Sequence, residues 1–342
     1  MTDQINKVAP AALPPRTLSV APMMDWTDRH CRKFHRQITR HTWLYTEMVT
    51  TGALVYGDVE RHLRFADEEH PVALQLGGSD PIDLAKSAKL GEQWGYDEIN
   101  LNCGCPSERV QKGAFGACLM AEPQLVADCV KAMRDAVSID VTVKHRIGID
   151  RNEDYGFVRD FVGTIADAGC KTFIVHARNA VLKGLSPKEN REIPPLKYEV
   201  AYQLKREFPS LEIIINGGIK TDDEIAQHLQ HVDGVMLGRE AYHNPYAMAT
   251  YDSRFFGDDA CIKSREEVLA LMIPYIQSQL DQYAARGLKL NSITRHMLGL
   301  MAGLPGARAF RQTLSDAKKL AGGDPGLLLE AAARMRFPHH PE

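Results

Sequence analysis

Residues 97–106 read DEINLNCGCP, a strand-like run from Asp97 to Leu101 that leads directly into a turn built from glycine and proline. Side chains that carry function are often held on loops that follow strands. This turn presents Cys105, and a second segment of small residues, GAFGAC, follows at residues 113–118. The stretch therefore predicts a strand followed by a long loop, and it makes Cys105 a candidate catalytic acid.

Runs of this kind recur along the chain and give eight candidate strands. They are residues 18–21, 43–48, 72–76, 97–101, 141–144, 173–176, 212–215 and 234–237. Amphipathic helical patterns lie between most of them, at residues 83–94, 124–137, 155–168 and 222–229. Strands that alternate with helices pair in parallel. Eight such units ending near Pro245 predict an α/β fold, a (β/α)8 TIM barrel with its chemistry on the loops after the strands.

A doubly wound sheet is the competing fold. The turn after the first candidate strand reads PMMDW at residues 22–26. It lacks the G-x-G-x-x-G pattern with which a doubly wound fold cradles a pyrophosphate. The barrel is therefore the favoured prediction.

The strand pattern stops after Pro245, and helical patterns follow at residues 265–285, 292–301, 307–319 and 326–334. The sequence thus predicts a disordered tail at residues 1–17, a barrel at 18–250 and an all-helical domain at 251–342. Between residues 286 and 319 the chain holds one acid, Asp316, and seven basic residues. These are Arg286, Lys289, Arg295, Arg308, Arg311, Lys318 and Lys319. The segregated charge favours a polyanion-binding surface, and a solvated helix face is an equally good explanation of the charge alone.

The composition limits the class of protein. The 342 residues are 44% hydrophobic and 25% charged, with a formal charge of −3. No apolar run is long enough to span a bilayer, and no signal peptide begins the chain, so we expect a cytoplasmic protein. Seven cysteines in such a chain are expected to be reduced thiols. A zinc site is disfavoured because Cys103 and Cys105 form a C-x-C pair with no second pair nearby, and no metal is predicted.

Polar side chains close most of the candidate strands. They are Gln75, Asn102, Lys144, His176 and Asn216. In a barrel, these positions meet at one mouth, where active sites lie. Gly217-Gly218 and Gly238-Arg239 follow the last two strands, the usual place for a phosphate in this fold. Lys144 alone fits either a Schiff-base amine or a cation beside a reduced flavin.

Together these motifs resemble the tRNA-dihydrouridine synthases, from Ser19 into the helical domain. The resembling segments are residues 19–29, 45–48, 73–77, 100–107, 143–144, 176–178, 216–218 and 234–239. Residues 190–196, NREIPPL, and the YTEM at 45–48 resemble the A subfamily, which acts on D-loop uridines near positions 20 and 20a of tRNA. The family's usual Asn-x-Gly-Cys-Pro motif has no cysteine at x, whereas this chain has Cys103 there.

The resemblance implies reduction of the uracil C5=C6 bond by FMN, with NADPH as reductant and Cys105 as proton donor. It implies FMN contacts from Pro22, Met23, Met24, Gln75, Lys144, His176, Asn216, Gly217, Gly218, Gly238 and Arg239. We also predict tRNA contacts from Asn102, Lys188, Asn190, Arg191, Arg295, Arg308 and Arg311. The protein is expected to be a monomer that binds the D-loop and elbow of tRNA.

Two other functions compete with this one. The first is another flavin barrel that acts on a free pyrimidine, similar to a dihydroorotate dehydrogenase. The second is a tRNA-binding protein without catalytic activity. The basic helical domain argues against the first, and Cys105 with its complete set of polar strand ends argues against the second.

Overall fold

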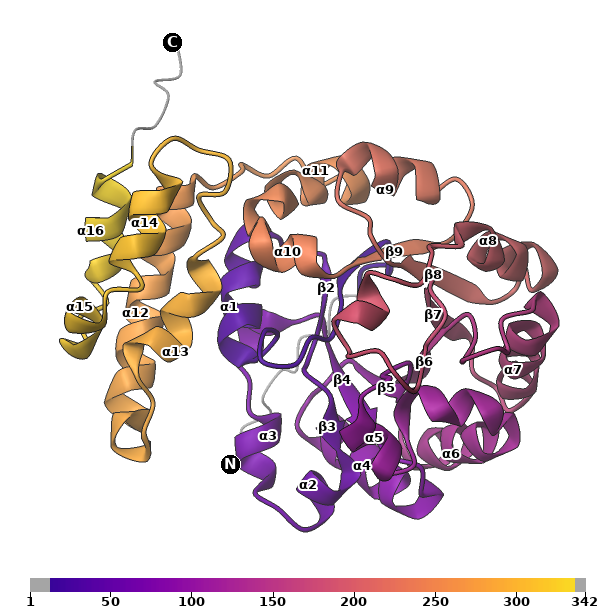
Figure 1. Cartoon of the computed structure of the whole chain (residues 1–342). Helices are drawn as coiled ribbons and strands as arrows, with labels where there is room; N and C mark the ends of the chain where they lie inside the picture. The colour runs from indigo at the N-terminus through magenta and orange to yellow at the C-terminus, as the bar shows by residue number, and fades with distance from the viewer. Residues whose placement is uncertain (1–12, 336–342) are drawn as a thin grey trace, which may run out of the picture.

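The structure is a computed structural model that describes residues 13–335. Within this range nine strands form one parallel sheet that closes on itself (Figure 1). The strands are β1 (Leu18–Val20), β2 (Trp43–Tyr45), β3 (Val49–Thr50), β4 (Val72–Gly77), β5 (Glu98–Cys103), β6 (Asp140–Arg146), β7 (Thr172–His176), β8 (Glu212–Asn216) and β9 (Gly234–Leu237). β1 pairs with both β2 and β9, and β2 pairs with β4. Eight strands therefore close the barrel, which confirms the predicted TIM barrel, and β3 is a short addition beside β4.

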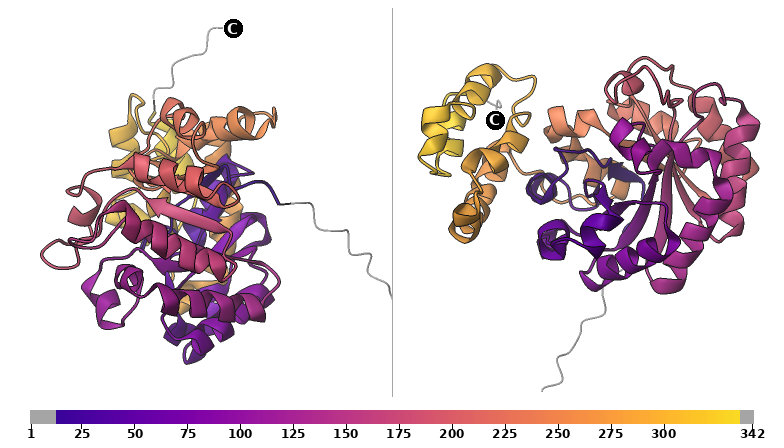
Figure 2. Two further views of the ribbon diagram at one scale, coloured as in Figure 1. Left: turned by 90° about the vertical axis from the view of Figure 1, so that its right-hand side faces the viewer. Right: turned by 60° about the horizontal axis from the view of Figure 1, so that its bottom comes forward.

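Helices cover the outside of the barrel (Figures 1 and 2). They are α1 (Arg29–Ile38), α2 (Thr51–Val55), α3 (Val59–Leu63), α4 (Pro81–Gln93), α5 (Glu108–Lys112), α6 (Pro123–Ala136), α7 (Tyr155–Asp167), α8 (Tyr198–Glu207), α9 (Asp222–His228) and α10 (Arg239–His243). Side-chain oxygens of Asp28, Asp80, Asp154 and Thr221 accept hydrogen bonds from backbone N–H groups in the first turns of α1, α4, α7 and α9. These caps satisfy donors that a helix start leaves free.

The barrel interior is packed by side chains that point inward from alternate strand positions. The apolar ones form a separate buried cluster of Ala21, Trp43, Tyr45, Ala73, Ile174, Ile214 and Met236. The outward-facing residues of the same strands, such as Leu44, Leu74 and Ile99, pack into the larger cluster beneath the helices. The barrel is thus a filled core, and its mouth is the place left for a ligand.

Arg16 closes the opposite end of the barrel. Its guanidinium pairs with carboxylates of three strands, Glu98 at 2.6 Å, Asp140 at 2.7 Å and Glu212 at 3.1 Å. The disordered tail predicted for residues 1–17 is therefore too long, because Arg16 is fixed beneath the barrel by these pairs. Residues 1–12 of that prediction lie outside the described residues.

The C-terminal helices are α12 (Arg265–Tyr283), α13 (Leu290–Thr294), α14 (Ala307–Thr313), α15 (Ala317–Ala321) and α16 (Leu327–Ala333). They stand beside the barrel and dock on it mainly where α12 faces α1 (Figure 1). The helix predicted at 307–319 is two helices, because the Asp316 carboxylate caps the start of α15. No helix within residues 13–335 has both the length and the apolar character needed to cross a membrane.

The boundary predicted between residues 250 and 251 lies too early. Helix α11 (Tyr251–Phe256) belongs to the barrel side. Its Asp252 accepts hydrogen bonds from the Thr39 hydroxyl at 2.7 Å and from the Arg40 N–H at 2.7 Å, both after α1. Its Arg254 pairs with Asp222 of α9 at 2.6 Å. The helical bundle itself begins with α12.

Candidate active site

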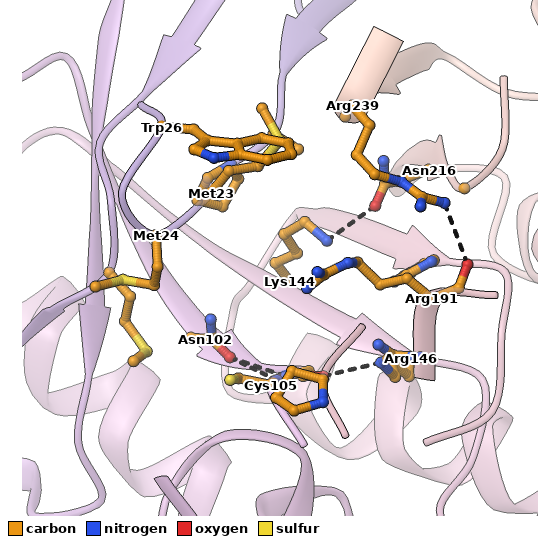
Figure 3. Close-up of a pocket in the computed structure, with 18 of the residues that line it drawn as sticks. Met23, Met24, Trp26, Asn102, Cys105, Lys144, Arg146, Arg191, Asn216 and Arg239 are labelled. Carbon is orange, nitrogen blue, oxygen red and sulfur yellow. Dashed lines mark hydrogen bonds between the residues drawn. The ribbon is translucent and has the colours of Figure 1, made fainter. Parts of the chain in front are cut away.

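A cavity of about 800 Å³ opens at the carboxyl ends of the barrel strands (Figure 3). All eleven residues predicted as FMN contacts line it, and so do Asn102, Cys105 and Arg191. They come from the carboxyl-terminal parts of β4, β5, β6, β7 and β8 and from the loops after β1, β5, β7, β8 and β9. The parallel barrel therefore brings these scattered residues to one place.

Cys105 lies on the turn after β5, and Asn102 shapes that turn. The Asn102 side-chain oxygen accepts hydrogen bonds from the Gly104 and Cys105 N–H groups, both at 3.0 Å. Such a side chain mimics a backbone turn and fixes the residue that follows. Burial raises the pKa of the Cys105 thiol above its usual value, although the Arg146 and Lys144 cations oppose that rise. Near neutral pH the thiol therefore keeps its proton.

Cys103 has a different environment from Cys105. It is the last residue of β5 and is fully buried in the main hydrophobic core. Burial raises the pKa of its thiol well above the usual value. Of the two cysteines in the C-x-C pair, Cys105 lines the cavity and Cys103 packs away from it.

A chain of hydrogen bonds connects the floor of the cavity with the barrel interior. The Asn102 amide donates to Gln75 at 2.8 Å, Gln75 donates to Asn100 at 2.8 Å, and Asn100 donates to Thr142 at 2.8 Å. The Thr142 hydroxyl then donates to Glu98 at 2.6 Å. Each amide is oriented by the next one, so Gln75 and Asn102 are held in one arrangement before any ligand binds.

Lys144 points into the cavity from the end of β6 (Figure 3). Its Nζ donates to the Asn216 side-chain oxygen at 3.1 Å. Burial, with a further contribution from the Arg146 guanidinium, lowers the pKa of Lys144 to about 7. Burial also lowers the pKa of His176 well below its usual value, so this imidazole is neutral. A negatively charged ligand group beside Lys144 would restore its positive charge.

The Gly217-Gly218 segment forms another wall of the cavity. Both residues have positive φ, 128° at Gly217 and 74° at Gly218. A Cβ atom on Gly218 would lie 2.7 Å from the end of the Leu196 side chain, and the positive φ would strain any larger residue there. The Tyr198 hydroxyl donates to the Gly217 carbonyl oxygen at 2.7 Å and fixes this turn. Positive-φ glycines leave the backbone open to close approach by a ligand.

Arg239 lies beside this turn at the start of α10. Its guanidinium pairs with Glu192 at 2.6 Å and also donates to the Arg191 carbonyl oxygen at 3.5 Å (Figure 3). Arg191, next to Glu192, also lines the cavity. Two guanidiniums thus lie at the rim, and Arg239 pairs with the Glu192 carboxylate.

The remaining predicted tRNA contacts lie outside the cavity. Lys188 is exposed on the loop after β7, and Arg308 and Arg311 are exposed on α14. Arg295 pairs with Asp28 at 3.1 Å, at the junction of α13 and α1. Their role as tRNA contacts stays a prediction.

Asn190, which is also predicted to contact tRNA, points into the protein. Its side chain is fully buried. It accepts a hydrogen bond from the Val181 N–H at 2.7 Å and donates to the Val181 carbonyl at 2.9 Å. The side chain therefore holds the loop after β7 together, and its amide is not free for RNA.

Several residues that line the cavity are not among those predicted from the sequence. Arg146 follows Lys144 by two residues, so the two-residue period of a strand places it on the same face. Its guanidinium donates to the Gly104 carbonyl oxygen at 2.9 Å and supports the Cys105 turn. Trp26 stacks on Tyr242 with ring centroids 4.5 Å apart, and His243 packs against its edge. The two-residue repeat of side-chain direction along β6 could have identified Arg146 from the sequence. No local sequence signal identifies Trp26.

Residues 19–335 match the family described as dihydrouridine synthase (Dus). A protein from Pseudomonas aeruginosa is 60% identical over 328 residues, 96% of this chain and 97% of the relative. Relatives from Salmonella typhimurium, 59% identical over 94% of this chain and 96% of its own length, and from Synechocystis sp., 58% identical over 94% and 95%, are similarly close. All three are named tRNA-dihydrouridine(20/20a) synthase. With the match extending over almost the whole chain, this protein belongs to the dihydrouridine synthase family.

Proposed function

We propose that this protein is a tRNA-dihydrouridine(20/20a) synthase that uses FMN, with NADPH as reductant. The observation that carries the proposal is the position of the Cys105 thiol in a cavity that also presents the Lys144 amine and the Gly217-Gly218 turn. Burial in this cavity raises the pKa of the thiol. A proton donor, a cation and an open backbone at one barrel mouth are the groups that flavin-dependent reduction of a base requires. The names of the close relatives support the same reaction.

The cavity residues fit FMN. Met23 and Met24 offer apolar surface to a ring system, and Lys144 is a buried amine with an amide partner, which a negatively charged ligand group would convert to a cation. Gly217 and Gly218 expose backbone to a phosphate, and Arg239 lies beside them. We infer that these residues, with Pro22, Gln75, His176, Asn216 and Gly238, hold the cofactor. FMN bound here supplies the hydride that C6 of the uracil receives.

The protein's own part in the reaction is to supply a proton and to stabilise charge. Once C6 has received a hydride, C5 needs a proton, and negative charge lies on the O4 side of the base. The Cys105 thiol gives its proton to C5 and becomes a thiolate, which regains a proton from solvent. The raised pKa of Cys105 keeps that proton in place near neutral pH. Asn102 and Arg146 hold the Cys105 turn, so the thiol need not reorganise during the transfer.

The uridine must leave the folded tRNA to reach the cavity, because the cavity lies at the mouth of a packed barrel. Extruding a base costs a few kcal/mol, which contacts to the RNA backbone offset. We assign these contacts to Arg191 at the rim, Lys188 on the same loop, and Arg295, Arg308 and Arg311 of the helical domain. The affinity for tRNA is then expected to fall steeply with added salt.

The test uses purified protein, tRNA from cells that lack this gene, and NADPH. We expect a yellow protein with a flavin absorbance spectrum that forms dihydrouridine at positions 20 and 20a. Free uracil and orotate serve as comparison substrates and should not be turned over. A colourless protein that does not take up FMN, or one that prefers orotate to tRNA, would overturn the proposal.

A further inference from the structure

Three arginines surround the ring of Tyr283, the last residue of α12. The Arg64 guanidinium carbon lies 4.0 Å from the ring centroid, that of Arg29 lies 5.0 Å away, and that of Arg286 lies 5.8 Å away. Arg29 is the first residue of α1, Arg64 follows α3, and Arg286 follows α12. The cluster therefore spans the seam between the barrel and the helical domain. We call these residues the Tyr283 arginine cluster.

The cluster lacks anionic partners. Within residues 13–335, none of the three guanidiniums forms an ion pair or donates a hydrogen bond to the chain. The Arg64 Nε atom is buried and has no hydrogen-bond partner. A buried donor that stays unpaired is costly. Two other basic residues of α1 are paired, since Arg32 binds Glu69 at 2.8 Å and Lys33 binds Glu68 at 2.8 Å.

Attraction to Tyr283 does not explain three cations. A guanidinium over an aromatic face gains about 1 kcal/mol at such a site. Three like charges around one ring repel each other, and a partly buried position screens that repulsion less than open water does. In line with this, burial and the nearby Arg64 charge lower the pKa of Arg29. An anion between the guanidiniums would remove the repulsion and satisfy their donors.

Docking of the helical domain does not require the cluster either. Tyr275, two helical turns before Tyr283, makes the buried contact with α1, where its hydroxyl lies 2.8 Å from the His30 ring nitrogen. Lys33 also lies over the Tyr275 ring, at 5.6 Å. Tyr283 is the last residue of α12, so it and its arginines lie beyond the Tyr275 contact along this helix.

Arg29 of the cluster directly follows a loop that lines the cavity. Asp28, which precedes Arg29, ends the loop that follows β1, and Met23, Met24 and Trp26 of that loop line the cavity. The segment that lines the cavity and the helix that carries Arg29 are therefore consecutive in the chain. Guanidinium groups bind phosphate oxygens through two parallel hydrogen bonds.

We propose that the Tyr283 arginine cluster binds a phosphodiester of the substrate RNA and holds it across the barrel and the helical domain. This inference depends on the proposed function, because it takes RNA as the polyanion. The tRNA strand then contacts both domains at once, so the cluster also sets how the RNA lies relative to the cavity.

The test measures the dissociation constant for unmodified tRNA as a function of salt. In the Arg29→Gln/Arg286→Gln double variant of the holoenzyme, we expect about tenfold weaker binding near 0.1 M salt and a shallower salt slope, lower by about one to two. The Arg29→Lys/Arg286→Lys double variant keeps both charges and should keep the slope. Arg206→Gln removes one charge from α8, on the far side of the barrel, and should change nothing.

Two outcomes would overturn the inference. One is a Gln double variant whose salt slope equals that of the wild type. The other is Lys and Gln variants that lose affinity and thermal stability equally, since this would mean that the cluster only docks the helical domain. The slope is measured on binding alone, so it stays informative if the protein proves inactive on uridine. Failure of the proposed function is detected separately, by the absence of dihydrouridine formation in the wild type.

Discussion

The two ends of the barrel both carry buried polar side chains, but they use them differently. At the end opposite the mouth, which we call the lower end, Arg16 contacts three carboxylates. Tyr45 donates its hydroxyl proton to Glu98 there, at 2.8 Å. At the mouth, Lys144 has a single amide partner and Cys105 faces a cavity. Full pairing produces a closed structural plug, whereas incomplete pairing leaves groups available to a ligand. Within one barrel, the degree of pairing therefore distinguishes structure from function.

Replacing Cys105 at the mouth is expected to have the largest effect. Cys105→Ala removes the proton donor, and general acid catalysis contributes about 100- to 10,000-fold. We expect dihydrouridine formation to fall by about 1,000-fold, while flavin content and tRNA affinity stay near those of the wild type. Single-turnover formation of dihydrouridine measures the loss.

Cys103→Ala is the matched control, because Cys103 lies two residues away and packs into the core. It should keep the activity and lower the free energy of unfolding by about 1 kcal/mol. Activity that survives in Cys105→Ala but disappears in Cys103→Ala would show that Cys103, and not Cys105, is the proton donor.

Replacing Arg16 at the lower end should affect stability. Arg16→Met leaves Glu98 buried without its cation, and breaking a buried pair from one side costs about 3 kcal/mol or more. Urea unfolding measures the loss. Asp140→Asn removes only the exposed partner and should cost less than about 1 kcal/mol. If Arg16→Met also weakens FMN binding, the hydrogen-bond chain from Glu98 to Asn102 couples the two ends.

Much of the mouth could be predicted from the sequence because a barrel converts strand order into position. Lys144, His176 and Asn216 each end a run of β-branched residues, and parallel strands bring such ends together. Neither the ion pairs of Arg16 at the lower end nor the Tyr283 arginine cluster could be predicted. Arg16 lies in a proline-spotted stretch that reads as a tail, and its partners come from three distant strands.

The departures from the sequence-based expectations share one physical cause, which is that polar side chains bind backbone groups of the folded chain. Asn190 sits among polar and turn-forming residues, a composition typical of an exposed loop, yet it satisfies backbone groups of its own loop. Asp316 looked like part of one helix, but its carboxylate instead caps the start of α15. Composition alone does not show which partner a polar side chain finds in the folded chain.

Because Lys144 at the mouth lacks a carboxylate partner, we also expect the stability of the folded protein to depend on pH. Its pKa is about 7 in the folded protein and near 10.4 in an unfolded chain. Between these values the unfolded state binds the extra proton, so raising the pH stabilises the folded state, by at most about 1.4 kcal/mol per pH unit. In flavin-free protein, the wild type should therefore gain stability relative to Lys144→Met from pH 7 to pH 10. Parallel stability curves for the two proteins would contradict this.

Tyr198 provides the smallest and most local test of the mouth. Its hydroxyl donates to the Gly217 carbonyl at 2.7 Å and so fixes the turn that we assign to the cofactor phosphate. One such hydrogen bond contributes about 1 kcal/mol, so Tyr198→Phe should weaken FMN binding about fivefold. Fluorescence titration of flavin-free protein with FMN measures the change.

Riboflavin separates this effect from a general loosening of the mouth, because it has the same ring system but no phosphate. Its affinity should be the same for Tyr198→Phe and the wild type if Tyr198 acts only through the Gly217 turn. Tyr202→Phe is the matched control on the same helix, since its hydroxyl lies 2.6 Å from the His228 ring and does not contact the glycine turn. Equal losses of FMN and riboflavin affinity would mean that Tyr198 supports the barrel wall and not the phosphate position.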